Sequence, residues 1–169
     1  MERLETYKTE LDGVLLIKPP SFFEDFRGIY VETYNKPMFK EAGIDLEFME
    51  DDFCISQKYV LRGIHGSRNN WKLTGVTVGK VYQVMVNYDP TSPQFKQWTS
   101  VILSDQSRLM ALIPPMFGNS YLVLSSLVIY HYKQTKPYRE EDQFSLKWNA
   151  PELNIFWPID KPILSARDA

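Results

Sequence analysis

The sequence predicts an all-β domain, an antiparallel sandwich or barrel with one or two short helices. Short segments rich in Val, Ile, Leu and Tyr recur along the chain, bounded by Pro, Gly or Asp. Eleven prolines suit the connections between such strands. The 169 residues are enough to bury a substantial core, so we expect a single domain over residues 1–169.

The strand signals follow one another at regular spacing. We predict strands at residues 14–18, 28–34, 59–65, 72–78, 81–88, 98–103, 109–113, 121–124 and 127–133. Gly79 and Lys80 join two of them as a tight hairpin. A short helix is expected over residues 37–42, because Pro37 suits its first turn and Gly43 its end. A second helical turn is expected at residues 150–153.

The alternation along one predicted strand bears on function. Along residues 81–88, Gln83 and Asn87 share a face with Val81 and Met85. A face of mixed polarity is typical of a barrel whose interior holds a ligand as well as packing. The alternative is an amphipathic strand with its polar side in water, and the sequence leaves it open.

Several counts exclude kinds of chemistry. One cysteine and two histidines are too few for an internal disulfide, a multi-cysteine zinc site or a multi-histidine metal site. No glycine pattern binds a dinucleotide or forms a P-loop. We therefore expect no metal and no cofactor. A net charge of −2 gives no global attraction to nucleic acid, so an anionic ligand needs a local basic cluster. The N-terminal residues mix charges and no apolar stretch could span a bilayer, so we expect a soluble cytoplasmic protein with no membrane partner.

A few residues have side chains suited to proton transfer. His65 ends a predicted strand, and histidine titrates near neutral pH. Lys72 begins the next strand, Tyr132 is one of ten tyrosines, and Asp168 is near the end of the sequence, where fraying is the default. Each has an ordinary structural interpretation, so no single position is diagnostic.

The constellation of motifs is more informative than any member. In order, the chain contains Asp25-Phe26-Arg27-Gly28 with Glu32, Leu61-Arg62-Gly63-Ile64-His65, Gly79-Lys80-Val81-Tyr82, Ser92-Pro93-Gln94-Phe95, Ile113-Pro114-Pro115, Tyr132-Lys133, Trp157-Pro158 and Leu164-Ser165-Ala166-Arg167-Asp168-Ala169. Together these segments resemble the nucleotide-sugar 4-keto-6-deoxyhexose 3,5-epimerase family, and the resemblance runs from about residue 13 to residue 169.

The resemblance implies a cupin-type jelly-roll barrel, a homodimer, and catalysis without a metal. It implies that His65 is the base, Asp168 its partner, Lys72 the cation beside the substrate ketone and Tyr132 the acid. The substrate-binding residues that it implies are Arg62, Arg27 (from an exchanged N-terminal segment), Glu32 and Tyr138. The chemistry is consistent, because a ketone at C4 acidifies the hydrogens on C3 and C5 and no hydride moves.

The chain departs from the family pattern around the substrate. Gln83 and Asn87 replace aspartates, Asn119 replaces a histidine, Glu50-Asp51-Asp52 replaces Gln-Asp-Asn, and the loop between His65 and Lys72 is shorter. We therefore expect Asn119 and Asp52 to contact a different substrate.

These changes resemble a subgroup that acts on GDP-linked 4-keto-6-deoxy-heptoses in bacterial capsule biosynthesis. Our sequence-based hypothesis is an epimerase inverting C3, with or without C5, of a GDP-4-keto-6-deoxy-heptose. The alternatives are a dTDP-4-keto-6-deoxyhexose 3,5-epimerase, a cupin 3,4-ketoisomerase and a non-catalytic barrel that binds a nucleotide sugar.

Overall fold

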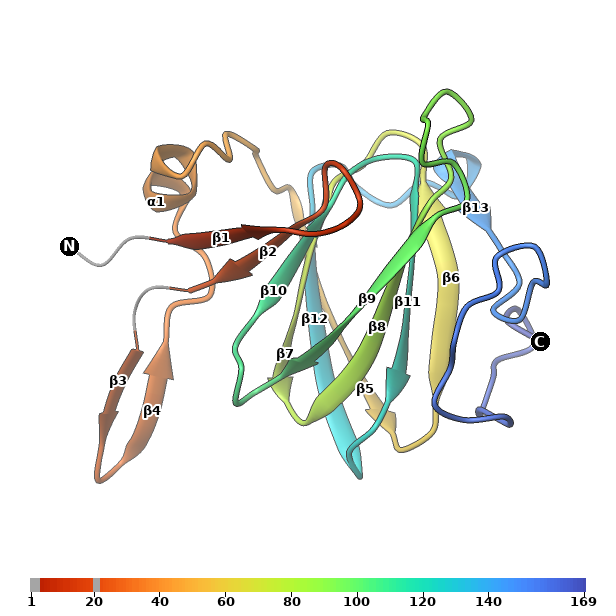
Figure 1. Ribbon diagram of the computed structural model, residues 1–169. Helices are drawn as coiled ribbons and strands as arrows, with labels where there is room; N and C mark the ends of the chain where they lie inside the picture. Colours follow the sequence, from red (N-terminus) through yellow and green to blue (C-terminus); the bar gives the residue numbers. More distant parts are fainter. Residues whose placement is uncertain (1–3, 20–21) are drawn as a thin grey trace.

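The computed structural model describes residues 4–19 and 22–169 and shows two antiparallel sheets that face each other as a flattened barrel (Figure 1). The six-stranded sheet has the order β1 (Glu5–Lys8), β2 (Leu15–Lys18), β10 (Met110–Ile113), β7 (Lys72–Val78), β12 (Leu127–Gln134) and β5 (Glu50–Gln57). The five-stranded sheet has the order β13 (Gln143–Ser145), β6 (Leu61–Ser67), β11 (Phe117–Val123), β8 (Lys80–Asn87) and β9 (Trp98–Ser104). The all-β prediction is confirmed.

The remaining elements lie beside the barrel. Strands β3 (Phe22–Asp25) and β4 (Gly28–Val31) form a separate hairpin, at the side of Figure 1 opposite the C-terminal segment. Helix α1 (Lys36–Glu41) follows. It begins where the Asn35 side chain accepts a hydrogen bond from the Met38 amide, the usual role of an N-cap asparagine. The helix buries Phe39 against Tyr34, whose ring centroid lies 4.9 Å away.

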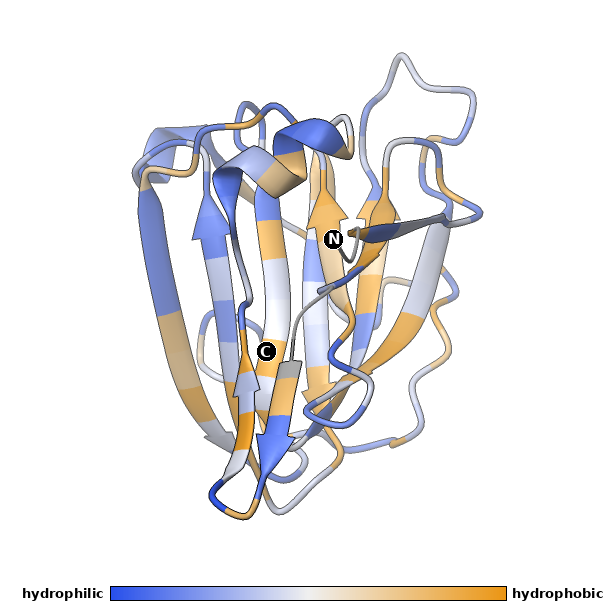
Figure 2. Ribbon diagram, turned by 90° about the vertical axis from the view of Figure 1, so that its left-hand side faces the viewer, coloured by the Kyte–Doolittle hydropathy of each residue, from blue (hydrophilic) through white to orange (hydrophobic). Residues whose placement is uncertain are grey.

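The core fills the space between the two sheets. One cluster joins Val76 and Val128 of the six-stranded sheet to Val81, Leu103 and Val123 of the five-stranded sheet. Figure 2 shows orange hydrophobic residues recurring along the barrel strands, interrupted by hydrophilic ones. Apolar burial of this kind stabilises by roughly 25 cal/mol per Å² removed from water.

The outer face of the five-stranded sheet is covered as well. Ile64, Val84 and Val86 pack there against Leu153 and other apolar residues of the C-terminal segment. The chain crosses this face after β13, and Leu146 exchanges backbone hydrogen bonds with Ile64. A covered outer face explains why strand β8 is buried on both sides.

Burial settles the two interpretations of β8. Gln83 is fully buried, as are its same-face neighbours Val81 and Met85. The alternative with the polar face in water is therefore wrong for this strand, because that face points into the barrel.

Some expected elements differ from the structure. The turn at residues 150–153 is closed by one hydrogen bond from the Leu153 amide to the Ala150 carbonyl and is not a helix. The second short helix is instead the 3₁₀ turn Glu140–Asp142. Strands β1, β3, β5 and β13 were not predicted. In residues 4–19 and 22–169, the structure has no helix long and apolar enough to cross a membrane.

Candidate active site

A cavity of about 340 Å³ lies within the barrel, beside the C-terminal segment. Its lining comes from β5, β6, β7, β11, β12 and residues 165–168, segments far apart in the sequence. The lining residues are Cys54, Arg62, His65, Lys72, Asn119, Tyr121, Tyr130, Tyr132, Ser165, Arg167 and Asp168. All four residues that the sequence analysis assigns to proton transfer line this one cavity.

His65 and Asp168 form the shortest polar contact of the site. Nε2 of His65 lies 2.6 Å from Oδ1 of Asp168, and Ser165 Oγ donates to the other carboxylate oxygen at 2.9 Å. The Asp168 side chain is 5% exposed, so the expected fraying does not occur. When the carboxylate accepts a hydrogen bond from Nε2–H, the neutral ring has its lone pair on Nδ1. Burial lowers the pKa of His65 even though Asp168 raises it, which favours the neutral, basic ring.

A β-bulge brings Arg62 and His65 into the same cavity. Strict alternation would point residues three apart to opposite faces. On β11, Asn119 pairs with His65 and Tyr121 with Arg62, so two steps of β11 match three steps of β6. The extra residue reverses the alternation. Gly63 within the bulge has φ +115°, and a Cβ there would lie 2.6 Å from the Asn119 carbonyl oxygen, so the position requires glycine.

Lys72 enters the cavity at the start of β7. The loop before it is held by the buried Asn70, whose side-chain nitrogen donates to the Lys136 carbonyl at 2.9 Å. The Asn70 side-chain oxygen accepts from Thr135 Oγ1 at 3.0 Å. Burial lowers the pKa of Lys72, and the nearby charge of Arg167 lowers it further. A cation in such a partly desolvated place interacts strongly with a developing negative charge.

Three tyrosines form the wall of the cavity. Tyr121 and Tyr130 stack with ring centroids 4.1 Å apart, and Tyr132 lies 6.3 Å from Tyr130. Burial raises the pKa of Tyr132 to about 12, with Asp52 adding to the shift, so its phenol keeps its proton at neutral pH. A phenol that stays protonated is suited to give a proton to substrate. Cys54 Sγ contacts the Tyr121 hydroxyl at 2.8 Å.

Arg62 is the one predicted phosphate ligand within this cavity. Its Nε donates to Ser56 Oγ at 3.1 Å, which orients the guanidinium. Arg167, which sequence reasoning did not select, adds a second arginine to the lining and donates to Ser145 Oγ at 3.1 Å. Two arginines on one cavity supply the local basic cluster that an anionic ligand needs.

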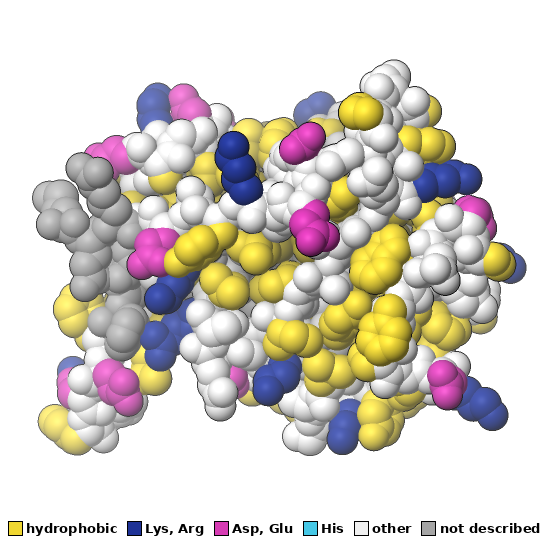
Figure 3. Space-filling model, viewed as in Figure 1, with side chains coloured by type: hydrophobic (Ala, Val, Ile, Leu, Met, Phe, Trp, Pro, Cys, Tyr) yellow, Lys and Arg dark blue, Asp and Glu magenta, His cyan; other side chains and the backbone are white. Residues whose placement is uncertain are grey.

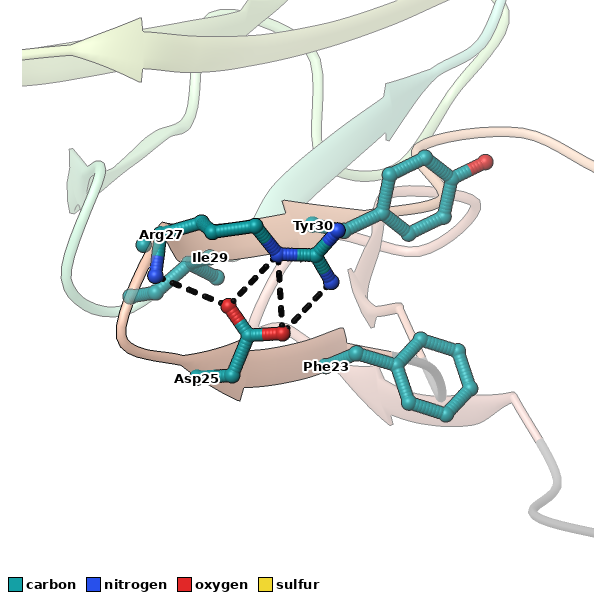
Figure 4. Close-up of a pocket in the computed structure, with 6 residues that line it drawn as sticks. Phe23, Asp25, Arg27, Ile29 and Tyr30 are labelled. Carbon is teal, nitrogen blue, oxygen red and sulfur yellow. Dashed lines mark hydrogen bonds and ion pairs between the residues drawn. The ribbon is translucent and has the colours of Figure 1, made fainter.

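Arg27 does not line the cavity of its own chain. The family resemblance implies that it holds phosphate from an exchanged N-terminal segment, that is, in the cavity of a partner chain. Figure 4 shows it at the turn of the β3–β4 hairpin, with its guanidinium on the Asp25 carboxylate. The distance from Arg27 Nη2 to Asp25 Oδ2 is 2.5 Å, and the hydrogen bonds from Arg27 lower the pKa of the Asp25 carboxyl. The Arg27 side chain is 76% exposed.

Glu32, Asp52 and Tyr138 also fall outside the lining of this cavity in the single chain, and their contacts with substrate stay predictions. Glu32 accepts a hydrogen bond from Asn35 Nδ2 at 3.3 Å, and Tyr138 is exposed. Asp52 lies opposite Tyr132 on β5, the strand that also carries Cys54, and burial raises its carboxyl pKa. It borders the site without lining it.

Five lining residues were missed: Cys54, Tyr121, Tyr130, Ser165 and Arg167. Tyr130 shares a strand face with Tyr132, and Ser165 and Arg167 belong to the terminal motif, so patterns for those three were present. Cys54 gave no signal, because its strand was not predicted. Among the described residues, no group of three or more His, Cys, Asp or Glu side chains could hold a metal ion.

The arrangement is suited to moving protons on carbon next to a carbonyl. It has a neutral imidazole backed by a carboxylate, a protonated phenol, a half-buried amine and two guanidinium groups around one cavity. The amine could stabilise an enolate oxygen and the guanidinium groups could hold phosphates.

Comparisons with known proteins agree with this chemistry. Residues 8–169 match the family described as dTDP-4-dehydrorhamnose 3,5-epimerase. A protein of that name from Methanothermobacter thermautotrophicus is 35% identical over 173 residues, covering 99% of this chain and 93% of the relative. The counterpart from Salmonella typhimurium is 36% identical, covering 96% of this chain and 91% of the relative.

Two solved structures share the fold closely, which confirms the cupin-type jelly-roll prediction. The dTDP-6-deoxy-D-glucose-3,5-epimerase of Legionella pneumophila, in complex with dTDP-4-keto-L-rhamnose, has a TM-score of 0.92 at 35% identity, covering 98% of this chain and 90% of that one. The dTDP-4-dehydrorhamnose 3,5-epimerase of Bacillus anthracis, with TDP and pyrophosphate bound, has a TM-score of 0.92 at 32% identity, covering 98% and 96%. The chain is therefore a carbohydrate epimerase of the dTDP-4-dehydrorhamnose 3,5-epimerase family.

Proposed function

We propose that this chain epimerises a dTDP-linked 4-keto-6-deoxyhexose at C3 and C5, with His65 as base and Tyr132 as acid. The observation that carries the proposal is the convergence of His65, Lys72, Tyr132 and Asp168 on one cavity, with His65 held by Asp168 at 2.6 Å. The names of the relatives support the dTDP-linked hexose, and so favour this alternative over the GDP-heptose hypothesis.

The proposed reaction begins with proton abstraction. His65 takes a proton from the carbon beside the ketone. The C–H electron pair becomes the C=C bond of an enolate, and the carbonyl π pair moves onto O4. Asp168 stabilises the imidazolium that forms, and Lys72 faces the oxyanion. A base of this kind contributes about 10²- to 10⁴-fold in rate.

The second step returns a proton from the opposite side. Tyr132 gives its phenolic proton to the carbon while the enolate re-forms the ketone, which inverts the centre. Solvent then reprotonates the phenolate and accepts the proton from His65. In this scheme Arg62 and Arg167 bind the diphosphate, so the sugar lies deeper in the cavity, between the imidazole and the phenol.

The test is exchange with deuterated water. We expect the enzyme to place deuterium at C3 and C5 of dTDP-4-keto-6-deoxyglucose, read by NMR, and a His65→Asn variant to lose this exchange while still binding dTDP. If the wild-type enzyme binds the nucleotide sugar but neither carbon gains deuterium, the chain only binds its ligand and the proposal fails. A 3-keto product would identify a ketoisomerase instead.

A second candidate substrate is a GDP-linked 4-keto-6-deoxy-heptose. It is favoured by the changed residues around the sugar, above all Asn119, which lies directly opposite His65, and Gln83 behind it. Parallel reactions with GDP- and dTDP-linked 4-keto sugars decide between them. A kcat/KM at least about tenfold higher for the GDP-linked compound, equivalent to about 1.4 kcal/mol, would reverse our choice.

We further propose a homodimer in which the β3–β4 hairpin meets the neighbouring chain. The hairpin exposes Phe23, Phe26, Ile29 and Tyr30, at 72%, 98%, 51% and 64%. Figure 3 shows hydrophobic atoms at the end of this projecting hairpin, and Figure 4 shows Phe23 and Tyr30 side by side. Exposed apolar groups around an arginine suit a protein partner rather than solvent.

The dimer is tested by mixing two inactive variants. Arg27→Ala and His65→Asn protomers, each impaired alone, should regain activity when co-refolded if Arg27 serves the partner's cavity. Light scattering that finds only monomers at micromolar concentration would contradict the proposal.

A further inference from the structure

A completely buried amide lies behind the cavity. Gln83 is in the barrel interior with no exposed surface, on a face that it shares with Val81 and Met85. Burying a primary amide among apolar residues is costly unless its groups are paired. Within the described part of the chain no buried side-chain nitrogen or oxygen lacks a hydrogen-bond partner. A methionine would fill this space without that requirement, so the amide needs another explanation.

The partners of Gln83 give its hydrogen bonds a direction. The Thr74 hydroxyl has one hydrogen, and two oxygens lie within its reach: Gln83 Oε1 at 3.2 Å and the Ala111 carbonyl oxygen at 3.4 Å. Both can accept this hydrogen, and neither has one to give back. Thr74 Oγ1 is then left to accept from Gln83 Nε2 at 2.9 Å. The second Nε2 hydrogen goes to Asn119 Oδ1 at 2.8 Å. The Asn119 oxygen is therefore occupied from behind.

The same bond determines which group Asn119 presents to the cavity. Its Nδ2 donates to the Tyr130 hydroxyl at 3.2 Å, which uses one of two hydrogens. Asn119 lines the cavity and pairs with His65 across the strands β6 and β11. Because Oδ1 of Asn119 is held by Gln83, its side-chain amide presents the remaining Nδ2 hydrogen to the cavity, as a donor beside His65.

We propose that Gln83 is a positioning residue that fixes Asn119 as a hydrogen-bond donor to an oxygen of the substrate sugar, next to the carbon that His65 deprotonates. This rests on the proposed function above. Asn119 is the residue that touches substrate, and Gln83 acts only through it. An amide neither gains nor loses a proton near neutral pH, so the donor is present across the working range. Free rotation of the amide would present oxygen instead, which repels a ketone or enolate oxygen.

A double-mutant cycle tests the coupling. Gln83→Met keeps the volume but removes the donor, and Asn119→Ala removes the donor that faces the sugar. We expect each to lower kcat/KM by roughly ten- to a hundredfold, the size of a lost hydrogen bond to a charged or partly charged oxygen. The double variant should be no worse than Asn119→Ala within about twofold, because Gln83 has no other route to the substrate.

Two controls separate positioning from a general structural effect. Met85→Leu changes a buried residue on the same strand and face, in the core cluster beside the cavity network, and should leave kcat/KM unchanged. Affinity for dTDP alone should be unchanged in every variant, since the network faces the sugar. The inference would be overturned if the losses in kcat/KM of the two single variants multiplied in the double variant. It would also be overturned if affinity for dTDP alone fell as much as kcat/KM.

A binding measurement keeps this result distinct from the test of turnover. The ratio of the Kd for dTDP to that for a non-reacting dTDP-6-deoxyhexose reports what the sugar contributes, without any chemistry. We expect the ratio to fall in Gln83→Met and Asn119→Ala to a similar extent. A ratio that neither variant changes would overturn the inference even in an active enzyme. An enzyme without deuterium exchange would refute the proposed function alone.

Gln83→Glu adds a pH readout. A protonated carboxyl has an O–H to donate to Asn119 Oδ1, whereas an ionised one does not. Relative to wild type, Gln83→Glu should therefore recover activity as the pH falls, while the deficit of Gln83→Met stays constant. A Gln83→Glu enzyme as impaired as Gln83→Met at every pH would contradict positioning through a donated hydrogen bond.

Discussion

Replacing Asp168 by asparagine tests the pair at the centre of the proposed mechanism. The carboxylate lies 2.6 Å from Nε2 of His65 and is nearly inaccessible to solvent. Asparagine has the same shape but no charge, so the substitution removes the stabilisation of the imidazolium while leaving the packing in place.

The size of the effect follows from the geometry. Two unit charges separated by 2.6 Å interact by about 6 kcal/mol at an effective dielectric constant of about 20. The His65 side chain is 27% exposed, so water screens part of this energy, and the amide retains a hydrogen bond. We expect about 2–4 kcal/mol to be lost at the transition state, or roughly 30- to 1,000-fold in kcat.

The assay is the initial rate of deuterium incorporation into the 4-keto sugar, measured by NMR under saturating substrate. Affinity for dTDP and the midpoint of thermal unfolding serve as controls and should stay near wild type. Ser165→Ala removes only the 2.9 Å hydrogen bond to the far carboxylate oxygen and should cost about threefold to tenfold. An Asp168→Asn enzyme that keeps more than about a third of the wild-type kcat would refute the role given to this carboxylate.

Three further predictions follow from the site. Burial lowers the pKa of both His65 and Lys72. Because the base must be neutral and the amine protonated, kcat/KM should fall as the pH drops through the first pKa and again as it rises through the second. In a pH series, the midpoints of the two falls in kcat/KM should lie below the ordinary pKa values of histidine and lysine. Midpoints at those ordinary values would contradict the prediction. Tyr132→Phe should lower the yield of inverted product about 10²- to 10⁴-fold while deuterium still enters with retention, and NMR of the recovered sugar distinguishes the two. Gly63→Ala should reduce the free energy of unfolding by roughly 1–3 kcal/mol, because its methyl group would meet the Asn119 carbonyl at 2.6 Å; an unchanged denaturant midpoint would contradict this.

Sequence reasoning predicted the strands whose signals are local. The segments around β7, β8 and β12 have the composition and alternation of strands, and their ends fall within one residue of the prediction. Strand β5 was missed because it begins with Glu50, Asp51 and Asp52, and acidic residues are depleted in strands. Its pairing along the full length of β12 overrides that preference, which no local pattern can show.

The candidate site was predicted more fully by motif than by periodicity. His65, Lys72, Tyr132 and Asp168 meet in one cavity although their positions span more than a hundred residues. Alternation alone would have placed Arg62 and His65 on opposite faces, since a bulge depends on strand pairing rather than on composition. The hairpin of Arg27 lies away from this cavity for a different reason: β3 and β4 pair with each other in a separate two-stranded sheet beside the barrel.

The bulge at Gly63 also bears on how this barrel can be altered. Because two steps along β11 match three steps along β6, Arg62 and His65 face the same cavity only when two residues separate them. Deleting or inserting one residue there would turn the imidazole toward Leu146 and the apolar covering of the sheet, and no small shift could restore it. Efforts to redesign substrate preference should therefore keep the length of β6 fixed and vary the facing wall on β5 and β12, where side-chain exchanges leave the register intact.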